Sequence, residues 1–274
     1  MPRFEPHPAR RPAVVTGASA GIGAATALAL ASAGHPVVLG ARRIDRLEEL
    51  AGKIQADGGE AVALPLDLAD DASIDGFAVA AEERLGPIEV LVSNAGDVAP
   101  ATALGIDPAT FAAQVQVNVV GAHRLARALG TGMVERRRGD IVFITSDVVR
   151  VPRTYMAAYV TSKHALEGLA RAMQMELEGT GVRVGIVRPG PASTEQGSTW
   201  PAAVVDEVLA DWDRWGIMRH PGYLRPRDIA AAVLAVVSTP RGTHLTLVEV
   251  EPEAPVDPET GDREPGDRET GAAG

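Results

Sequence analysis

The chain has 274 residues and a formal net charge of −10, with 46% hydrophobic and 23% charged residues. These are ordinary globular proportions, and a chain of this length can bury the core of one large α/β domain. The negative charge argues against a general nucleic-acid-binding protein, which needs a basic face to neutralise phosphates. The chain contains no cysteine, which excludes disulfides, thiolate nucleophiles and Cys-ligated metals.

The chain also lacks the patterns typical of export or of membrane insertion. Met1–Pro12 carries charges and prolines but no apolar stretch of the kind found in secretory signals. No run approaches about 18 apolar residues, so no transmembrane helix is expected. We therefore predict a cytoplasmic protein that does not insert into a membrane.

Composition divides the chain into three parts. We expect a flexible N-terminal segment over residues 1–10 and one folded domain over residues 11–250. From Glu251 the chain is rich in Pro, Gly, Glu and Asp, and it cannot bury enough apolar surface to offset the entropy lost on ordering. Residues 251–274 are therefore predicted to be a disordered acidic tail.

Within the domain, short apolar runs alternate with longer amphipathic stretches, which predict buried strands and helices respectively. The predicted strands are Ala13–Thr16, Val37–Gly40, Ala61–Leu66, Val90–Ser93, Ile141–Thr145, Val182–Val187 and Leu245–Val250. The predicted helices are Gly21–Ala33, Ile44–Ala56, Ser73–Leu85, Pro108–Gly130, Tyr155–Glu178 and Arg227–Ser238. This alternation predicts a single doubly wound Rossmann domain, with a mostly parallel sheet of about seven strands and helices on both faces. Ligands then bind outside the carboxyl ends of the strands.

Residues 195–223 interrupt the alternation and hold all three tryptophans. The segment contains Trp200, Trp212, Trp215 and Met218. An insertion ahead of the last helix and strand is a candidate substrate lid with an apolar wall. The alternative is a helical excursion that packs on the body of the domain.

A glycine-rich loop follows the first predicted strand and opens the first helix. Gly17, Gly21 and Gly23 lie within it. Glycines let the backbone turn tightly and approach a pyrophosphate, and the helix that follows offers free N–H groups and the positive end of its dipole. The loop therefore predicts a dinucleotide site.

The second strand ends without the acidic residue that usually holds the ribose 2′-hydroxyl of NAD. Ala41 stands there, followed by Arg42 and Arg43. Arginines suit a 2′-phosphate through charge-assisted hydrogen bonds, which favours NADP(H), with NAD(H) still possible. Alternatively, both arginines are solvated residues at the start of a helix.

Tyr159 and Lys163 lie four residues apart, so on a helix they share one face. A phenol has a pKa of about 10, and a nearby cation lowers it by stabilising the phenolate. The pair can therefore exchange a proton in an alcohol–ketone interconversion. Lysine occurs elsewhere only at Lys53, so this spacing rarely arises by chance. The alternative is a tyrosine and a lysine on a solvated helix face.

Further residues stand around this pair in a characteristic order. They are the loop Thr16-Gly17-x-x-x-Gly21-x-Gly23, then Asp67, Asn94-Ala95-Gly96, Asn118, Ser146, Tyr159-x-x-x-Lys163 and Pro189-Gly190. With these matches the chain resembles the classical short-chain dehydrogenase/reductase (SDR) family over residues 11–250. The resemblance implies an NAD(P)-dependent oxidoreductase acting on a carbonyl or secondary alcohol. It also implies a homotetramer or homodimer formed through the two long helices.

The resemblance assigns four catalytic residues. Tyr159 would exchange the proton with the substrate oxygen, and Lys163 would hold the nicotinamide ribose and tune Tyr159. Ser146 would hydrogen-bond the substrate carbonyl, and Asn118 would hold a water that links Lys163 to solvent.

The resemblance also implies a set of cofactor-binding residues, distributed over the carboxyl ends of the strands. They are Gly17, Ser19, Ala20, Gly21, Ile22, Gly23, Arg42, Arg43, Asp67, Leu68, Asn94, Ala95, Gly96, Tyr159, Lys163, Pro189, Gly190 and Thr194. Thr194 would touch the nicotinamide carboxamide, although the neighbouring Ser193 offers a second hydroxyl.

Asp147 stands beside Ser146, where the family often has small residues. We expect its carboxylate to face away from the pocket. If it faced the pocket, substrates with a polar or basic group would be favoured. Independently of Asp147, the apolar wall offered by residues 195–223 predicts a lipophilic substrate.

Other functions are less favoured. The six histidines are scattered without metal-ligand spacing, so no metal is expected. A hydrolase, which needs its serine in a Gly-x-Ser-x-Gly turn, is set aside. The remaining alternative is a non-catalytic NADP(H)-binding regulatory protein on the same fold.

Overall fold

The computed structural model describes residues 4–195, 200–217, 220–254 and 256. Its centre is a seven-stranded sheet in the order β3-β2-β1-β4-β5-β6-β7, in which every neighbouring pair is parallel. The strands are β1 (Ala13–Thr16), β2 (Val37–Ala41), β3 (Ala61–Pro65), β4 (Val90–Ser93), β5 (Gly139–Ile144), β6 (Val182–Pro189) and β7 (Leu247–Val250). The predicted doubly wound fold is confirmed, and strand order reverses between β1 and β4.

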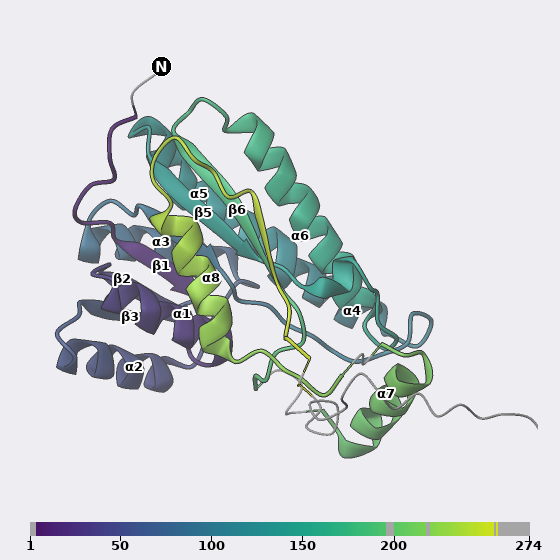
Figure 1. The fold of residues 1–274 in the computed structure, drawn as a ribbon. Coiled ribbons are helices and arrows are strands. Elements are labelled where there is room, and N and C mark those ends of the chain that lie inside the picture. Colours follow the sequence, from purple (N-terminus) through teal and green to yellow (C-terminus); the bar gives the residue numbers. More distant parts are fainter. Residues whose placement is uncertain (1–3, 196–199, 218–219, 255, 257–274) are drawn as a thin grey trace, which may run out of the picture.

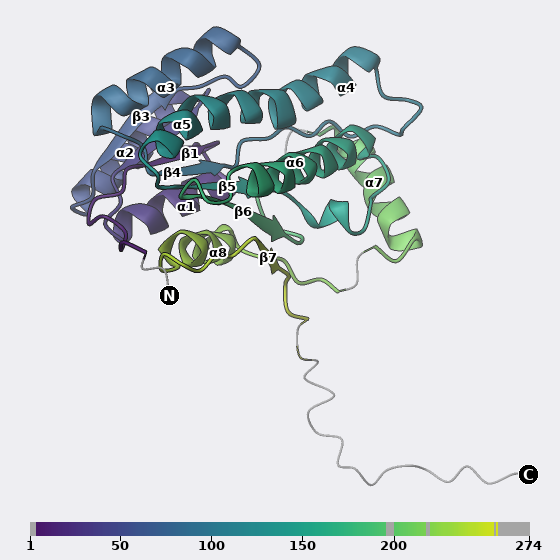
Figure 2. The same cartoon turned by 90° about the horizontal axis from the view of Figure 1, so that it is seen from above.

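Helices cover both faces of the sheet (Figures 1 and 2). They are α1 (Gly21–Ser32), α2 (Ile44–Ala56), α3 (Asp71–Leu85), α4 (Pro108–Val115), α5 (Ala122–Glu135), α6 (Ala157–Glu176), α7 (Ala202–Arg214) and α8 (Pro226–Ser238). Core residues of α3, α5 and α6 pack on one face, and those of α1, α2 and α8 pack on the other.

Two apolar cores explain why the strands read as continuous hydrophobic runs. Successive side chains of a strand point to opposite faces. In β1, Val14 belongs to the core beside α3, α5 and α6, whereas Val15 belongs to the core beside α1, α2 and α8. Both side chains are fully buried. A strand covered on both faces has no polar alternation.

The prediction of one regular helix over residues 108–130 is wrong, because the segment is interrupted and ends later than predicted. The segment begins as α4, continues as a π-helical stretch η1 (Gln116–Gly121) and resumes as α5, which ends at Glu135. Asn118 in η1 is buried and hydrogen-bonds the backbone of Asp97 on a separate loop. Periodicity within one helix does not reveal such a contact, and π-bulges are frequent at functional sites.

Two helix starts follow from side chains in the sequence. The Asp70 carboxylate accepts a hydrogen bond from the backbone N–H of Ala72 and caps α3. At α8, the backbone N–H of Arg225 donates to Asp228 and Pro226 is the first helical residue, one residue before the predicted start at Arg227. Such caps satisfy N–H groups that have no partner within the helix.

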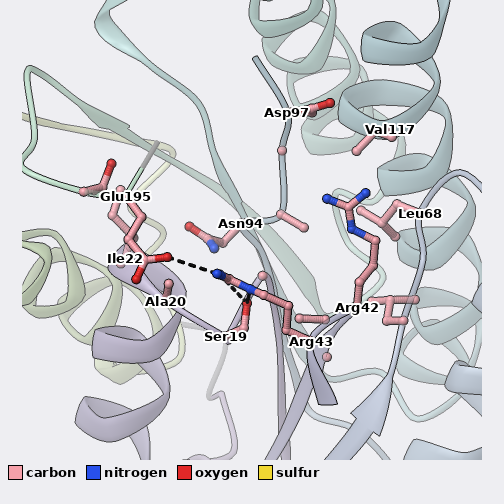
Figure 3. A pocket seen from close by; sticks show the side chains of 18 of the residues that line it. Ser19, Ala20, Ile22, Arg42, Arg43, Leu68, Asn94, Asp97, Val117 and Glu195 are labelled. Atoms are coloured by element: carbon pink, nitrogen blue, oxygen red, sulfur yellow. Dashed lines mark hydrogen bonds and ion pairs between the residues drawn. The ribbon is translucent and has the colours of Figure 1, made fainter. Parts of the chain in front are cut away.

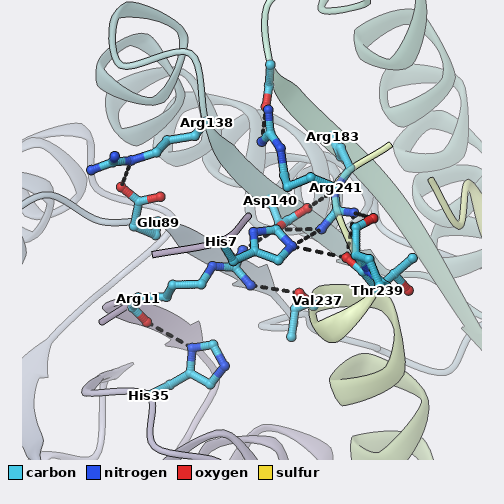
Figure 4. A network of polar contacts seen from close by, with 12 residues as sticks. His7, Arg11, His35, Glu89, Arg138, Asp140, Arg183, Val237, Thr239 and Arg241 are labelled. Carbon is cyan, nitrogen blue, oxygen red and sulfur yellow. Dashed lines mark hydrogen bonds and ion pairs between the residues drawn. The ribbon is translucent and has the colours of Figure 1, made fainter. Parts of the chain in front are cut away.

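The amino ends of the strands are joined by a buried polar network (Figure 4). Asp140 at the start of β5 accepts hydrogen bonds from Arg11, which precedes β1, and from Arg183 of β6. Arg11 also donates to the Val237 carbonyl at 2.7 Å, and His7 contacts the Thr239 carbonyl at 3.0 Å. The network lies at the sheet edge opposite to the strand ends where ligands bind.

Helix α7 lies within the tryptophan-rich segment and beyond the carboxyl ends of the strands (Figure 1). Trp212 of α7 donates from Nε1 to the Thr154 carbonyl at 3.2 Å, which ties α7 to the loop before α6. Met218 lies outside the described residues. Among the helices that the structure describes, none combines the length and the apolar character needed to cross a membrane.

Candidate active site

Two clefts open at the carboxyl edge of the sheet. The loop cleft, with a volume of about 720 Å³, lies over the glycine-rich loop and the ends of β2, β3 and β4 (Figure 3). The inner cleft, of about 330 Å³, lies over the ends of β5 and β6 and is walled by α7. Ile22, Asn94, Gly96 and Thr194 line both clefts, so the two form one continuous space.

The predicted site residues fall into these two clefts with two exceptions. The loop cleft is lined by Gly17, Ser19, Ala20, Gly21, Ile22, Arg42, Arg43, Asp67, Leu68, Asn94, Ala95, Gly96 and Thr194. The inner cleft is lined by Ser146, Tyr159, Lys163, Pro189 and Gly190. Gly23 and Asn118 line neither, and both lie behind the surface in contact with residues that do.

The glycine-rich turn is shaped by two glycines that no larger residue could replace. Gly17 has φ +66°, a left-handed conformation that favours glycine. A Cβ on Gly23 would lie 2.2 Å from the Gly17 carbonyl oxygen. The start of α1 is capped by no side chain in the described part of the chain, so its N–H groups remain available to an anion. This cradle fits a dinucleotide pyrophosphate.

Thr16 holds the end of β4 against the end of β1. Its Oγ1 accepts hydrogen bonds from the backbone N–H groups of Asn94 at 3.0 Å and Ala95 at 2.9 Å. The Asn94 side chain donates to the Thr16 carbonyl at 2.9 Å. Asn94 therefore shapes the floor between the two clefts, where the strand order reverses.

Three arginines gather at the outer end of the loop cleft. Arg43 donates to Ser19 Oγ at 2.9 Å and to the Glu195 carboxylate at 3.1 Å, whereas Arg42 extends toward Leu68 (Figure 3). Arg46 donates to Glu195 at 2.8 Å. The hydrogen bonds from Arg43 and Arg46 lower the pKa of the Glu195 carboxyl. Sequence reasoning missed Arg46, although it lies in the first turn of α2, three residues after Arg43, which immediately precedes the helix.

Tyr159 and Lys163 are brought together on the buried side of α6. Tyr159 is 8% exposed and Lys163 is 4% exposed. The Lys163 Nζ lies 5.5 Å from the centre of the Tyr159 ring and donates to the Ile144 carbonyl at 2.9 Å. Burial lowers the pKa of Lys163 to about 8. The alternative of a solvated helix face is thereby excluded, because both side chains are buried beside a cleft.

Asn118 is fixed behind Lys163 by three hydrogen bonds. Its Oδ1 accepts from the Asp97 N–H at 2.7 Å, and its Nδ2 donates to the Asp97 carbonyl and to Ser162 Oγ, both at 2.9 Å. A Cβ on Gly96 would lie 3.3 Å from Asn118 Oδ1 and 3.6 Å from Lys163 Nζ. Asn118 and Lys163 therefore approach each other across Gly96.

The expectation that Asp147 faces away from the pocket is wrong. Asp147 lines the inner cleft and is 7% exposed. Ser146 Oγ donates to its Oδ1 at 3.1 Å, and Arg153 forms an ion pair with its Oδ2. Burial raises the pKa of Asp147, while Arg153 and Ser146 oppose that rise. The carboxylate turns inward because Arg153, six residues further on, supplies the compensating charge that a buried acid needs.

The buried lysine gives a pH-dependent prediction for Lys163→Met. The pKa of Lys163 is about 8 in the folded protein and 10.5 for an unperturbed lysine, so the unfolded chain binds more protons between these values. Stability of the native protein then rises with pH through this window, and the variant lacks that rise. The free energy of unfolding of the variant minus that of the native protein should fall by about 2 kcal/mol from pH 7.5 to pH 9.5.

Urea unfolding at both pH values measures this difference, since titration of all other groups cancels. Lys53→Met is the matched control because Lys53 is exposed, and its difference should not change with pH. Parallel curves for the native protein and the Lys163 variant would contradict the shifted pKa.

Two further site types bear on the interpretation. The hydrolase was set aside too early on the sequence, because the Gly-x-Ser-x-Gly pattern does occur, at Gly17-Ala18-Ser19-Ala20-Gly21. The structure has to decide whether Ser19 can act as a nucleophile. Ser19 Oγ instead accepts hydrogen bonds from Arg43, and no histidine lines either cleft in the described ranges. The same ranges contain no group of three His, Asp or Glu side chains suited to a metal ion.

Comparisons with known proteins agree with this geometry. Residues 11–204 match the family model described as short chain dehydrogenase. The chain is 35% identical over 240 residues to 2,3-dihydro-2,3-dihydroxybenzoate dehydrogenase of Bacillus subtilis, covering 86% of this chain and 91% of that protein. This chain belongs to the short-chain dehydrogenase family. The resemblance noted from the sequence is confirmed, and so is the expectation of an oxidoreductase.

Solved structures of this dehydrogenase's relatives share its fold over most of its length. An alcohol dehydrogenase from the archaeon Thermococcus sibiricus, complexed with 5-hydroxy-NADP, matches with a TM-score of 0.76 and 32% identity, covering 88% of this chain and 96% of that one. Actinorhodin polyketide ketoreductase with NADPH matches with a TM-score of 0.80 and 27% identity, covering 89% and 96%.

Proposed function

We propose that this dehydrogenase transfers hydride reversibly between NADP(H) and a carbonyl or secondary alcohol of a small, largely apolar substrate. The observation that carries the proposal is the gathering of Ser146, Tyr159 and Lys163 in the inner cleft, directly beside the loop cleft. A phenol, a hydroxyl and a buried ammonium at one point suit proton exchange with an oxygen atom.

The loop cleft supports NADP(H) as the cofactor. Its glycine turn and uncapped helix suit the pyrophosphate, and Arg42 and Arg43 suit a 2′-phosphate. The relatives described above were solved with NADP-type cofactors. When bound, the nicotinamide supplies or accepts the hydride. Asp67 and Leu68 line the outer part of the cleft, and Thr194 lines both clefts, consistent with contacts to the adenine and the nicotinamide ends.

In the inner cleft, this chain's own residues manage the proton. Tyr159 gives its hydroxyl proton to the substrate oxygen during reduction and takes it back during oxidation. The positive charge of Lys163 stabilises the resulting phenolate. Ser146 donates to the substrate oxygen, which requires its hydroxyl to turn from Asp147. Asn118 lies where it can position a water beside Lys163, as the family resemblance implies.

The wall of the inner cleft supports an apolar body for the substrate. Met156, Trp200, Trp212 and Ile217 line it. Trp200 and Trp212 pack with Tyr159 in one small apolar cluster. We propose that the segment 195–223 acts as the substrate lid, because Trp200, Trp212 and Ile217 in its described part line this wall.

The preference for NADPH is tested by Arg42→Ala. Loss of a charge-assisted contact to the 2′-phosphate should raise KM for NADPH by about 10- to 100-fold and leave KM for NADH nearly unchanged. Initial rates with both cofactors measure the two values. Arg84→Ala is the control because Arg84 is exposed and lies away from both clefts. Equal effects on both cofactors would contradict a phosphate-binding role.

The activity itself is tested with purified protein, NADPH and a panel of ketones and aldehydes, by following the loss of NADPH absorbance. Turnover of at least one member is expected. Tight NADPH binding without turnover of any panel member, by the native protein and by Tyr159→Phe alike, would favour the non-catalytic regulatory protein. Light scattering after size-exclusion chromatography tests the homotetramer or homodimer that the family resemblance implies.

A further inference from the structure

The inner cleft contains a buried ion pair that proton exchange at Tyr159 does not require. The side chains of Asp147 and Arg153 are 10% and 12% exposed, and both line the cleft. Burying two charges in an apolar cavity is costly, and an apolar pair of similar volume would hold the loop equally well. The pair therefore calls for an explanation in terms of what enters the cleft.

Arg153 has unused hydrogen-bonding capacity. A guanidinium carries five N–H donors, and among the described residues only Asp147 accepts from Arg153, through Nη2. Arg153 lines the inner cleft, and in the described part of the chain none of its side-chain nitrogens is both fully buried and unpartnered. Its remaining donors are therefore accessible to a group that enters the cleft.

Asp147, in contrast, has both carboxylate oxygens engaged. Oδ1 accepts from Ser146 at 3.1 Å, and Oδ2 accepts from Arg153. The charged side chains that the structure places along the inner cleft are Asp147, Arg153 and Lys163. Their formal sum is one positive charge. Both the unused donors and the charge favour an anionic group over a basic one.

Trp212 holds Arg153 in place for such a group. The Arg153 guanidinium stacks on the Trp212 ring at 5.4 Å from its centroid. Trp212 is itself fixed by its hydrogen bond to the Thr154 carbonyl. Stacking occupies a face of the guanidinium and leaves the N–H groups along its edges able to donate to a carboxylate.

We propose that Arg153 binds a carboxylate of the substrate, so that the enzyme acts on oxo acids and hydroxy acids with an apolar body. This inference rests on the proposed hydride transfer and specifies its substrate class. Asp147 links Arg153 to Ser146 through two successive hydrogen bonds. A substrate whose carbonyl oxygen meets Ser146 can therefore present its carboxylate to Arg153 within the same cleft.

The turnover test compares a cyclic oxo acid with its methyl ester, which has the same carbonyl but no charge, in the presence of NADPH. The native enzyme should show a higher kcat/KM for the acid. Arg153→Met keeps an apolar stem against Trp212 and should lower the acid-to-ester ratio by about 10- to 100-fold, chiefly through KM. Because Arg153 also compensates the buried charge of Asp147 beside Ser146, any general loss of activity lowers the rates for acid and ester alike, and the acid-to-ester ratio isolates the recognition of the carboxylate.

Two other variants separate recognition from structural support. Arg150→Met is the matched control, since Arg150 lies on the same segment, pairs with Glu249 at 2.8 Å and does not line the inner cleft. Its acid-to-ester ratio should equal the native ratio. Asp147→Asn keeps the Arg153 charge and removes its counter-charge, so the ratio should be maintained or increased. A ratio that fell with Asp147→Asn as it does with Arg153→Met would overturn the proposal.

A binding measurement keeps the inference testable without turnover. Benzoate and the uncharged benzamide are titrated into the full-length protein, and tryptophan fluorescence reports binding near Trp212. Benzoate should bind more tightly than benzamide, and Arg153→Met should remove the difference. Suppose that the native protein reduces no member of the panel, yet binds benzoate and loses this binding in Arg153→Met. That result would refute the proposed function but not the anion site. The anion site would be refuted if the native protein bound benzoate and benzamide equally, or if Arg153→Met lowered kcat/KM for the acid and for the ester by the same factor.

Discussion

Tyr159→Phe is expected to lower kcat by about 10²- to 10⁴-fold, the usual contribution of a positioned acid or base. The phenylalanine ring keeps the packing against Trp200 and Trp212 in the apolar cluster around Tyr159 and removes only the hydroxyl. Proton exchange with the substrate oxygen then has no donor, while the loop cleft is unchanged. The dissociation constant for NADPH should therefore change by no more than a few-fold.

Single-turnover rates and NADPH titrations measure the two quantities separately. Tyr155→Phe is the matched control, because Tyr155 lines neither cleft and its hydroxyl contacts Glu207 at 3.4 Å. Its kcat should remain native. A Tyr159→Phe enzyme with native kcat would show that another group supplies the proton.

Asp140→Asn should produce a large loss of stability. The buried carboxylate pairs with Arg11 and Arg183, whose side chains are 6% and 12% exposed. Asparagine keeps the shape but leaves two arginines without their counter-charge. Removing one partner of a buried ion pair costs about 3–5 kcal/mol, because the remaining charge is left uncompensated.

Urea unfolding measures this loss as a lower midpoint. Glu60→Gln is the control: Glu60 pairs with Arg10 at 3.1 Å, but both side chains are more than half exposed, so its loss should cost at most about 1 kcal/mol. The folded Asp140→Asn enzyme should retain native kcat, since Asp140 lies at the start of β5 and the clefts lie at the carboxyl ends of the strands. A midpoint equal to that of the control would contradict the buried network.

Much of the site was predictable because its signals are local. The glycine turn and the spacing of Tyr159 and Lys163 depend on residues within one loop or one helix. Ser146 follows β5 directly, so the parallel sheet brings it to the same edge as the glycine turn. The prediction that Asp147 faces away from the pocket was wrong because the charge of Asp147 is balanced by Arg153. Arg153 is held in the cleft by its contact with Trp212, which is distant in the sequence.

The alternation of continuously apolar runs and amphipathic stretches by itself determined the doubly wound sheet. A strand buried on both faces is an unbroken apolar run and a helix has its own period, so each pattern can be recognised within one element. The helix spacing likewise determined that Tyr159 and Lys163 lie on one face of a helix, and the structure shows them buried 5.5 Å apart, from the Lys163 Nζ to the centre of the Tyr159 ring. Only the tertiary structure decided which charges enter the clefts. Arg43 meets Glu195 and Trp212 meets the loop before α6 across long stretches of chain. Such contacts depend on how separate elements pack, and no local period records that packing.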